Sequence, residues 1–177
     1  FFNGHTNITS SRFLVFGVKG MLSAAKNVRN AMLFNVLSFM SDKLLTVGNT
    51  VAALDELYIW LSNPTAIEYI RNCLKRVRKK ESAMLLASQN LEDFDQEHVR
   101  EMTKPLFSIP PHQFLFNAGS IDKRSCMEML QLDEAEYNLI KFPQRGVCLY
   151  KCGNERYLLE VHAPTYKEKL FGTAGGR

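Results

Sequence analysis

The chain has 177 residues, 46% of them hydrophobic and 23% charged, and its 22 Lys and Arg against 18 Asp and Glu leave a formal charge of +4. These values fit one globular core and exclude intrinsic disorder, because a disordered chain has too little apolar surface to bury. The most apolar stretch, residues 31–40, contains Asn35 and Ser38 and has about half of the roughly 20 residues that a membrane span needs. The four cysteines form no C-x-x-C pair, which argues for unpaired thiols rather than a disulfide framework. Because the chain opens on Phe1 instead of Met, we expect a piece of a longer protein.

The first half of the chain predicts strands that alternate with helices. Apolar runs typical of buried strands occur at residues 13–18, 51–54 and 83–87. Helical spacing of apolar residues predicts one helix over 27–45 and a second that ends near residue 80. The second helix begins at Asn63-Pro64, with Asn63 as the cap and Pro64 in the first helical position.

The second half predicts a further strand, three helices and a hairpin. The predicted ranges are a helix at 96–103, a strand at 113–117, helices at 121–131 and 133–141, and hairpin strands at 146–151 and 156–161. Asp133 and Glu136 are placed to cap the helix that follows. Together these elements predict an α/β fold with a mostly parallel sheet flanked by helices and a C-terminal antiparallel hairpin. Residues 1–170 form the predicted domain and residues 171–177 a flexible tail.

Two acidic residues follow the second predicted strand directly. Asp55 and Glu56 come after four apolar residues, which is the Walker B pattern of nucleotide hydrolases. In that pattern the first carboxylate orients the water shell of a Mg²⁺ bound to ATP, without a direct metal ligand from the protein, and the second polarises the attacking water. Taken alone, the pattern is also compatible with an acid pair that ends a strand.

Gln89 ends the next predicted strand along the chain. Ligands of open α/β sheets bind at the carboxyl ends of the strands, so Gln89 is expected beside the acid pair. An amide there can hydrogen-bond both a phosphate and the attacking water, and can report hydrolysis to the loop over residues 90–96. The alternative is an amide that satisfies loop backbone.

A basic run lies between the last two of these predicted strands. Six of the ten residues from Arg71 to Lys80 are Lys or Arg. A solvated helix end, a nucleic-acid surface, or an arginine finger that reaches a neighbouring subunit all explain such a run. Arg76 and Arg78 are finger candidates, and Arg145, in the sequence Gln-Arg-Gly before the hairpin, is another.

Five segments, in this order, resemble one known family. They are NGHTNI (3–8), NVRNAMLFNVLSF (27–39), ALDELYIWL (53–61), IEYIRNCLKRVRKKESAMLLASQNLEDF (67–94) and FPQRGVCLYKCGNERYLLEVHAP (142–164). The chain resembles the VirB/TraE-type ATPases of type IV secretion and conjugation, a RecA-like branch of the P-loop NTPases that includes the FtsK and HerA translocases. The resemblance covers nearly the whole chain.

The resemblance implies roles for the candidate residues. Asp55 and Glu56 match the Walker B pair, and Gln89 matches the strand-end glutamine. The cluster that contains Arg76 and Arg78 matches a basic motif of the family, and Arg145 lies in its Gln-Arg-Gly motif. The implied cofactors are ATP and Mg²⁺.

The resemblance also implies a cellular role. Family members energise assembly of a channel or pilus and export of DNA or protein, at the cytoplasmic face of the bacterial inner membrane. The implied partners are other secretion subunits and further copies of the chain in a homo-oligomer such as a hexamer. The resemblance also implies peripheral association with the inner membrane and contact with DNA. A DNA translocase or coupling ATPase of the FtsK/HerA type, and a non-catalytic docking domain on a RecA-like scaffold, are the alternatives.

One motif of the family is absent from the sequence. No G-x-x-x-x-G-K-[ST] occurs, and Gly17-Val18-Lys19-Gly20 lacks its spacing and its Ser or Thr. We therefore expect the chain to be the C-terminal part of a RecA-like domain whose phosphate-binding loop lies upstream. Such a chain would bind little ATP alone, although the full-length protein would be an ATPase.

Overall fold

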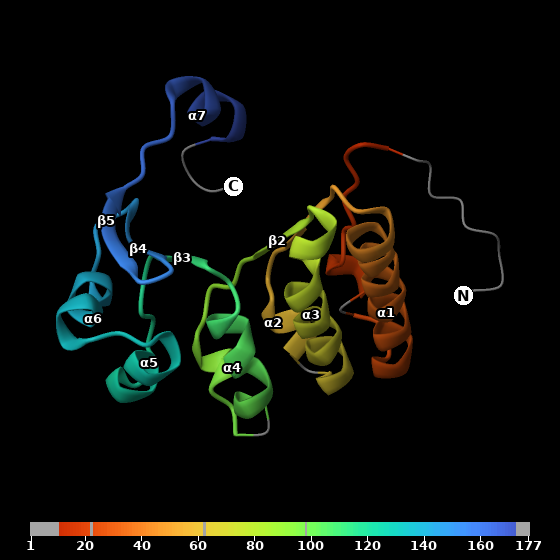
Figure 1. Cartoon of the computed structure of the whole chain (residues 1–177), viewed down its shortest axis with the longest axis horizontal. Helices are drawn as coiled ribbons and strands as arrows, with labels where there is room; N and C mark the ends of the chain where they lie inside the picture. The colour runs from red at the N-terminus through yellow and green to blue at the C-terminus, as the bar shows by residue number, and fades with distance from the viewer. Residues whose placement is uncertain (1–10, 22, 62, 98, 173–177) are drawn as a thin grey trace.

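The computed structural model describes residues 11–21, 23–61, 63–97 and 99–172 (Figure 1). The quoted segment 3–8 and residues 173–177 of the predicted tail lie outside the described residues. The helices are α1 (Lys26–Asp42), α2 (Tyr58–Leu61), α3 (Pro64–Arg76), α4 (Arg100–Ser108), α5 (Lys123–Leu130), α6 (Glu134–Lys141) and α7 (Thr165–Phe171). The strands are β1 (Val51–Leu54), β2 (Ala83–Leu86), β3 (His112–Leu115), β4 (Val147–Cys152) and β5 (Glu155–Glu160).

The first sheet consists of β1 and β2, which run parallel. Val51 is in register with Ala83, and Leu54 with Leu86. Beyond the strands, the backbone N–H of Ala87 donates to Leu54 and the N–H of Leu57 donates to Ala87, both at 2.9 Å. These two hydrogen bonds fix the relative position of the segments that follow the strands. The predicted pairing of neighbouring parallel strands is confirmed.

The helices beside this sheet surround the first hydrophobic core. α1 contributes Leu33, Leu37 and Met40, spaced three or four residues apart on one face of the helix. α3 contributes a similar stripe that includes Ile67 and Ile70, both fully buried. In Figure 1, α1, α3 and α4 stand side by side.

The helix starts follow the predicted caps closely. The Oδ1 atom of Asn63 accepts a hydrogen bond from the backbone of Thr65, and Pro64 opens α3. Asp133 and Glu136 form a reciprocal capping box at the start of α6. Such caps satisfy N–H groups that the first turn of a helix leaves without backbone partners. Sequence reasoning missed the short helices α2 and α7 and placed the start of α4 four residues too early.

The second sheet is antiparallel, with strand order β3-β4-β5. The predicted hairpin is confirmed as β4 and β5, but residues 112–115 pair with β4 instead of joining a parallel sheet. This pairing places Leu115 beside Leu149, and both pack into a second core with α5 and α6. The expectation of one mostly parallel sheet is therefore wrong for the described residues, because β3 completes the antiparallel sheet.

The apolar run at residues 13–18 is a second correction, because these residues form no strand. Phe16 packs edge-on against Phe39 of α1, with ring centroids 5.5 Å apart, and Val18 contacts the first core. Phe13 and Val15 are 82% and 77% exposed. Phe16 therefore packs on α1 and Val18 on the first core, and the backbone of the run pairs with no strand.

One face of the parallel sheet is open among the described residues. Val51 and Leu85 are 67% and 61% exposed, and neither β1 nor β2 pairs with a third strand there. Parallel sheets are normally covered on both faces, and two strands alone are marginally stable. The described residues therefore contain part of a parallel sheet and do not form a complete RecA-like one. In the same part of the chain, no helix is long and apolar enough to span a bilayer.

Candidate functional site

The strand ends place the three predicted site residues at one edge of the parallel sheet. Asp55 and Glu56 follow β1, and Gln89 lies three residues after the end of β2. The Nε2 atom of Gln89 donates a hydrogen bond to Oε1 of Glu56 at 2.5 Å, although the two residues are 33 positions apart. The structure thus brings the predicted acid and the predicted amide into direct contact.

The backbone of Glu56 has an unusual conformation. Its φ is +52°, in the left-handed region that side chains other than glycine occupy at a cost. Three other described residues besides glycines have positive φ. Glu81 and Gln131 cap the C-terminal ends of helices, where this conformation is common, and Asn49 is of a residue type that adopts it readily. Glu56 instead lies between β1 and α2. Strained non-glycine residues cluster at functional sites, so the conformation of Glu56 supports a functional role.

Asp55 accepts a hydrogen bond from the backbone of its neighbour. The Oδ1 atom of Asp55 lies 2.9 Å from the backbone nitrogen of Glu56, and this contact orients the carboxylate. The second oxygen of such a carboxylate can still hold a water of a Mg²⁺ hydration shell. Asp55 and Gln89 are exposed and Glu56 is half-buried, so a dissolved ligand can reach all three. The residues fit a site that contacts Mg²⁺ through water, and no cluster suited to direct metal binding occurs among the described residues.

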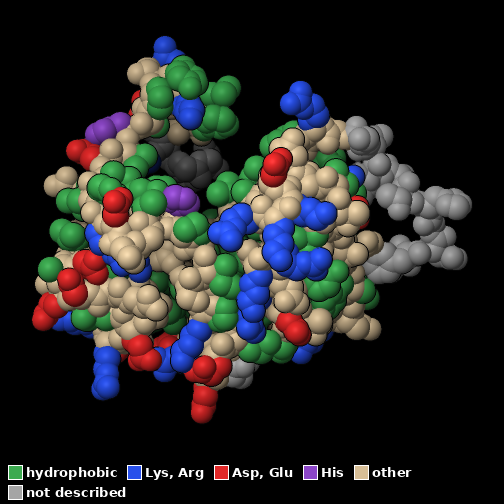
Figure 2. Space-filling model, in the orientation of Figure 1, with side chains coloured by type: hydrophobic (Ala, Val, Ile, Leu, Met, Phe, Trp, Pro, Cys, Tyr) green, Lys and Arg blue, Asp and Glu red, His purple; other side chains and the backbone are tan. Residues whose placement is uncertain are grey.

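The basic run lies at the opposite end of the parallel strands. Arg76 ends α3 and Arg78 lies in the 3₁₀ turn Val77–Lys80, and both side chains are exposed. The carbonyl of Lys80 accepts a hydrogen bond from the backbone of Asn49, two residues before β1, at 2.9 Å. This turn therefore sits at the amino ends of the strands, whereas Asp55, Glu56 and Gln89 follow their carboxyl ends. Figure 2 shows Lys and Arg side chains gathered over α3.

Arg145 lies in a turn that leads into β4. Gly146 has φ +83°, and a Cβ atom built there would lie 2.7 Å from the carbonyl oxygen of Val161. The Val161 N–H donates to the carbonyl of Gly146 at 2.8 Å, and the Val147 N–H donates to Gln144 at 3.0 Å. The turn therefore requires glycine beside Arg145, and the hairpin holds it in place.

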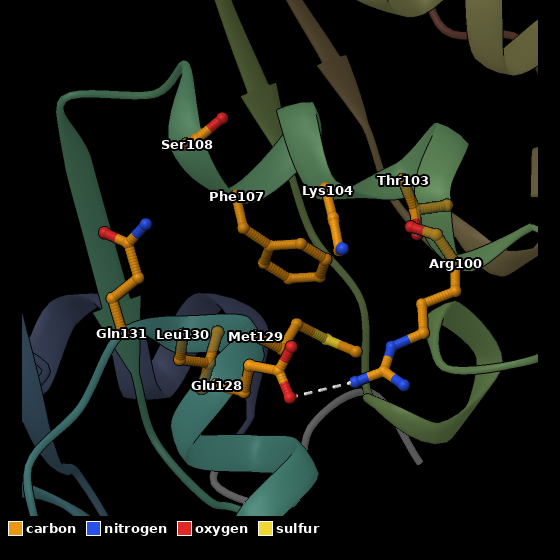
Figure 3. A pocket seen from close by; sticks show the side chains of 9 residues that line it. All are labelled: Arg100, Thr103, Lys104, Phe107, Ser108, Glu128, Met129, Leu130 and Gln131. Atoms are coloured by element: carbon orange, nitrogen blue, oxygen red, sulfur yellow. Dashed lines mark hydrogen bonds and ion pairs between the residues drawn. The ribbon is translucent and has the colours of Figure 1, made fainter.

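A cavity of about 320 Å³ opens between α4 and α5 (Figure 3). Arg100 and Glu128 form an ion pair of 3.3 Å between the two helices, and Phe107 and Met129 contribute apolar side chains. None of the predicted site residues lines this cavity. It marks the boundary between the two cores, which Phe107 and Met129 both contact.

Sequence reasoning missed one contact near the site. The Oε1 atom of Glu92 accepts hydrogen bonds from the backbone nitrogen of Ser120 at 2.9 Å and from its hydroxyl at 2.5 Å. Glu92 follows Gln89 by three residues, whereas Ser120 lies in the loop between β3 and α5. The acidic loop after β2 and the Gly119-Ser120 pair were visible in the sequence, but nothing in the sequence linked them.

The fold of the chain is similar to that of known solved structures. The structure of VirB4 of Thermoanaerobacter pseudethanolicus matches with a TM-score of 0.77 and 30% sequence identity, over 87% of this chain. The chain is VirB4-like. It spans 42% of the length of the VirB4 chain that it matches. No protein-family model and no curated protein matches the sequence.

The likeness to VirB4 supports the family resemblance seen in the sequence. Shared sequence and shared backbone arrangement extend over most of the VirB4-like chain.

Proposed function

We propose that the chain is the hydrolytic part of the ATPase motor of a type IV secretion or conjugation system. The contact between Glu56 and Gln89 at the carboxyl ends of β1 and β2 is the observation that carries the proposal. An acid in direct contact with an amide at this edge of an α/β sheet is suited to orient water against a phosphate. The likeness to VirB4 supports the same assignment.

In this proposal the three residues have separate roles. Glu56 polarises the attacking water, and Gln89 holds the Glu56 carboxylate and the water in line. Asp55 holds a water of the Mg²⁺ shell, and Mg²⁺ would supply charge neutralisation on the phosphates of ATP. The left-handed backbone of Glu56 directs its side chain toward Gln89 and fixes the pair before a nucleotide arrives.

The phosphate cradle belongs to another part of the full-length protein in this proposal. The 177 residues contain no G-x-x-x-x-G-K-[ST] sequence. Among the described residues β1 and β2 each pair only with the other, so each strand has an unpaired edge where a further strand can add. A phosphate-binding loop on such a strand would complete the site. By itself the chain is then expected to bind Mg-ATP weakly.

The arginine finger and the partners belong to the assembled machine. Arg145, Arg76 and Arg78 all stay finger candidates in this proposal, because a finger enters the site of a neighbouring copy and the distance from the site of its own chain does not choose between them. We propose a homo-oligomer, such as a hexamer, at the cytoplasmic face of the inner membrane, with other secretion subunits as partners and export of DNA or protein as the outcome.

A DNA translocase of the FtsK/HerA type is the second candidate. The concentration of Lys and Arg over α3 favours it (Figure 2). In that case DNA binding strengthens as salt falls and is lost when Arg76 and Arg78 are both changed to Ala. If the variant with both Arg76 and Arg78 changed to Ala loses ATPase activity but keeps its affinity for DNA, this candidate is contradicted.

The test of the proposed function is ATP turnover by the full-length protein. Glu56→Gln should reduce hydrolysis by at least about 100-fold while ATP affinity stays within about twofold, because the amide binds but cannot polarise water. Glu68→Gln, an exposed change on α3, is the matched control and should leave turnover unchanged. Unchanged turnover in Glu56→Gln would contradict the proposal, and so would a wild-type protein without any ATPase activity.

A further inference from the structure

The loop after β2 is held at two points downstream of Gln89. Glu92 begins a short 3₁₀ turn (Glu92–Phe94), and its carboxylate accepts the two hydrogen bonds from Ser120. Phe94 is buried in the first core, and its carbonyl accepts a hydrogen bond from the hydroxyl of Thr103 at 3.1 Å. Only two residues lie between Gln89 and Glu92. A displacement of the Gln89 backbone therefore displaces Glu92 as well.

The loop between β3 and α5 is shaped to receive the Glu92 carboxylate. Gly119 has φ +73°, and a Cβ atom built on it would lie 3.6 Å from Oε1 of Glu92. Its backbone N–H donates to the side chain of Asn117 at 2.9 Å, which directs the following N–H of Ser120 toward Glu92. The hydrogen bond from the Ser120 hydroxyl holds the pKa of Glu92 below its usual value. The carboxylate is thus bound in its charged form.

The same loop is connected to the turn that carries Arg145. The backbone N–H of Ala118 donates to the carbonyl of Ile140 at 3.0 Å, and both residues are buried in the second core. Ile140 lies one residue before the end of α6, and Gln144, where the Arg145 turn begins, follows three residues after that end. Hydrogen bonds therefore link Glu92 to Ser120, and Ala118 in the same loop to the last turn of α6, which leads into the Arg145 turn.

We propose that Glu92 is a positioning residue that couples the Gln89 end of β2 to the turn that carries Arg145. The inference rests on the proposed function, since it assigns a role to Glu92 in the same hydrolytic site. A change at Gln89 during hydrolysis displaces the Glu92 loop, and the Ser120 contact passes this displacement to the second core.

The structure offers a matched control for this coupling. Glu128 also carries a carboxylate that bridges the two cores, through its ion pair with Arg100 across the α4–α5 cavity (Figure 3). The side chains of Arg100 and Glu128 are 36% and 60% exposed. Arg100 also pairs with Asp95 of the loop after β2, at 3.1 Å, and Glu128→Gln leaves this second pair in place. Glu128→Gln therefore removes a bridge of the same chemistry and keeps the contact of Glu92 with Ser120.

The test compares Glu92→Gln with Glu128→Gln in the full-length protein. We expect Glu92→Gln to lower kcat by about tenfold with a change in the KM for ATP of less than twofold, because the hydrogen bonds to Ser120 weaken when the charge is removed. Ser120→Ala, which keeps the backbone donor, should show the same split with a smaller loss. Glu128→Gln should leave both parameters unchanged.

Amide hydrogen exchange of the 177-residue chain gives the second readout. In Glu92→Gln we expect faster exchange at Ser120 and also at Val147, whose N–H closes the Arg145 turn. Faster exchange at Ser120 alone, or a kcat for Glu92→Gln equal to that of Glu128→Gln, would overturn the coupling. If Glu56→Gln keeps its turnover, the proposed function itself fails, so the two failures are distinguishable.

Discussion

The amide of Gln89 and the carboxylate of Glu56 are in hydrogen-bond contact across two parallel strand ends. The contact depends on the register of β1 and β2, which pairs Leu54 with Leu86 and continues through Ala87. Two short polar segments that are far apart in the sequence are thereby held as one unit. A pair held this way is preorganised, and preorganised polar groups contribute more to catalysis than mobile ones.

The first prediction concerns the amide of this pair. Gln89→Leu in the full-length protein should lower kcat for ATP hydrolysis by about 100-fold, because Glu56 and the attacking water both lose their amide partner. The KM for ATP should stay within about twofold. Ser88→Ala, one residue earlier and also exposed, is the control and should retain normal turnover. A large rise in KM with normal kcat would instead assign Gln89 to ground-state binding.

The second prediction concerns the backbone strain at Glu56. Glu56→Gly should not lower the free energy of unfolding of the chain and should raise it by up to about 1 kcal/mol, because glycine occupies φ +52° without a steric cost. The same variant should have no ATPase activity in the full-length protein. Chemical denaturation monitored by circular dichroism measures the first effect. A loss of more than about 1 kcal/mol would show that the side chain of Glu56 stabilises the fold.

The third prediction tests the turn that carries Arg145. Gly146→Ala should lower the free energy of unfolding by about 2 kcal/mol or more, because the new Cβ atom would meet the carbonyl oxygen of Val161 at 2.7 Å. Gly153→Ala is the matched control, since Gly153 also has positive φ (+58°) but no atom lies within 4 Å of its Cβ position. Its cost should be about 1 kcal/mol. Equal losses in the two variants would mean that the contact with Val161 does not constrain the turn.

The fourth prediction is a pH dependence of stability. The hydrogen bonds from Ser120 lower the pKa of Glu92 in the folded chain, so the folded state binds the proton of this group less readily than the unfolded state does. The stabilisation is therefore present at neutral pH, above the pKa of the unfolded chain, and is lost as the pH falls through the folded-state pKa. Denaturation between pH 7 and about pH 3 should show a smaller acid-induced loss of stability in Glu92→Gln than in the wild type. Identical pH profiles would contradict a charged, hydrogen-bonded Glu92.

Much of the local structure follows from short-range chemistry and could be predicted. Asn63-Pro64 starts α3, and Asp133 with Glu136 starts α6, because a cap depends only on residues within one helical turn. The contact between Glu56 and Gln89 was also foreseeable. Both follow short apolar runs, and the ends of neighbouring parallel strands meet at one edge of a sheet.

The predictions that were wrong or missing concern segments whose structure depends on residues far away in the sequence. The apolar run at residues 13–18 has the composition of a strand, but Phe16 packs on Phe39 and Val18 on the first core. The strand predicted at residues 113–117 forms at 112–115 and pairs with β4 instead of joining the parallel sheet, because Leu115 gains Leu149 and the second core as neighbours. The contact of Glu92 with Ser120 joins two loops 28 residues apart, and no periodicity or capping rule links such positions.

The most direct test of the central claim is a double-mutant cycle on Glu56 and Gln89. ATP turnover by the full-length protein is measured for Glu56→Gln, Gln89→Leu and the double variant. If the two residues act as one hydrolytic unit, kcat of the double variant should lie within about twofold of kcat of the slower single variant. Losses that multiply, or single variants with wild-type turnover, would contradict the claim that the Glu56–Gln89 pair is the hydrolytic centre.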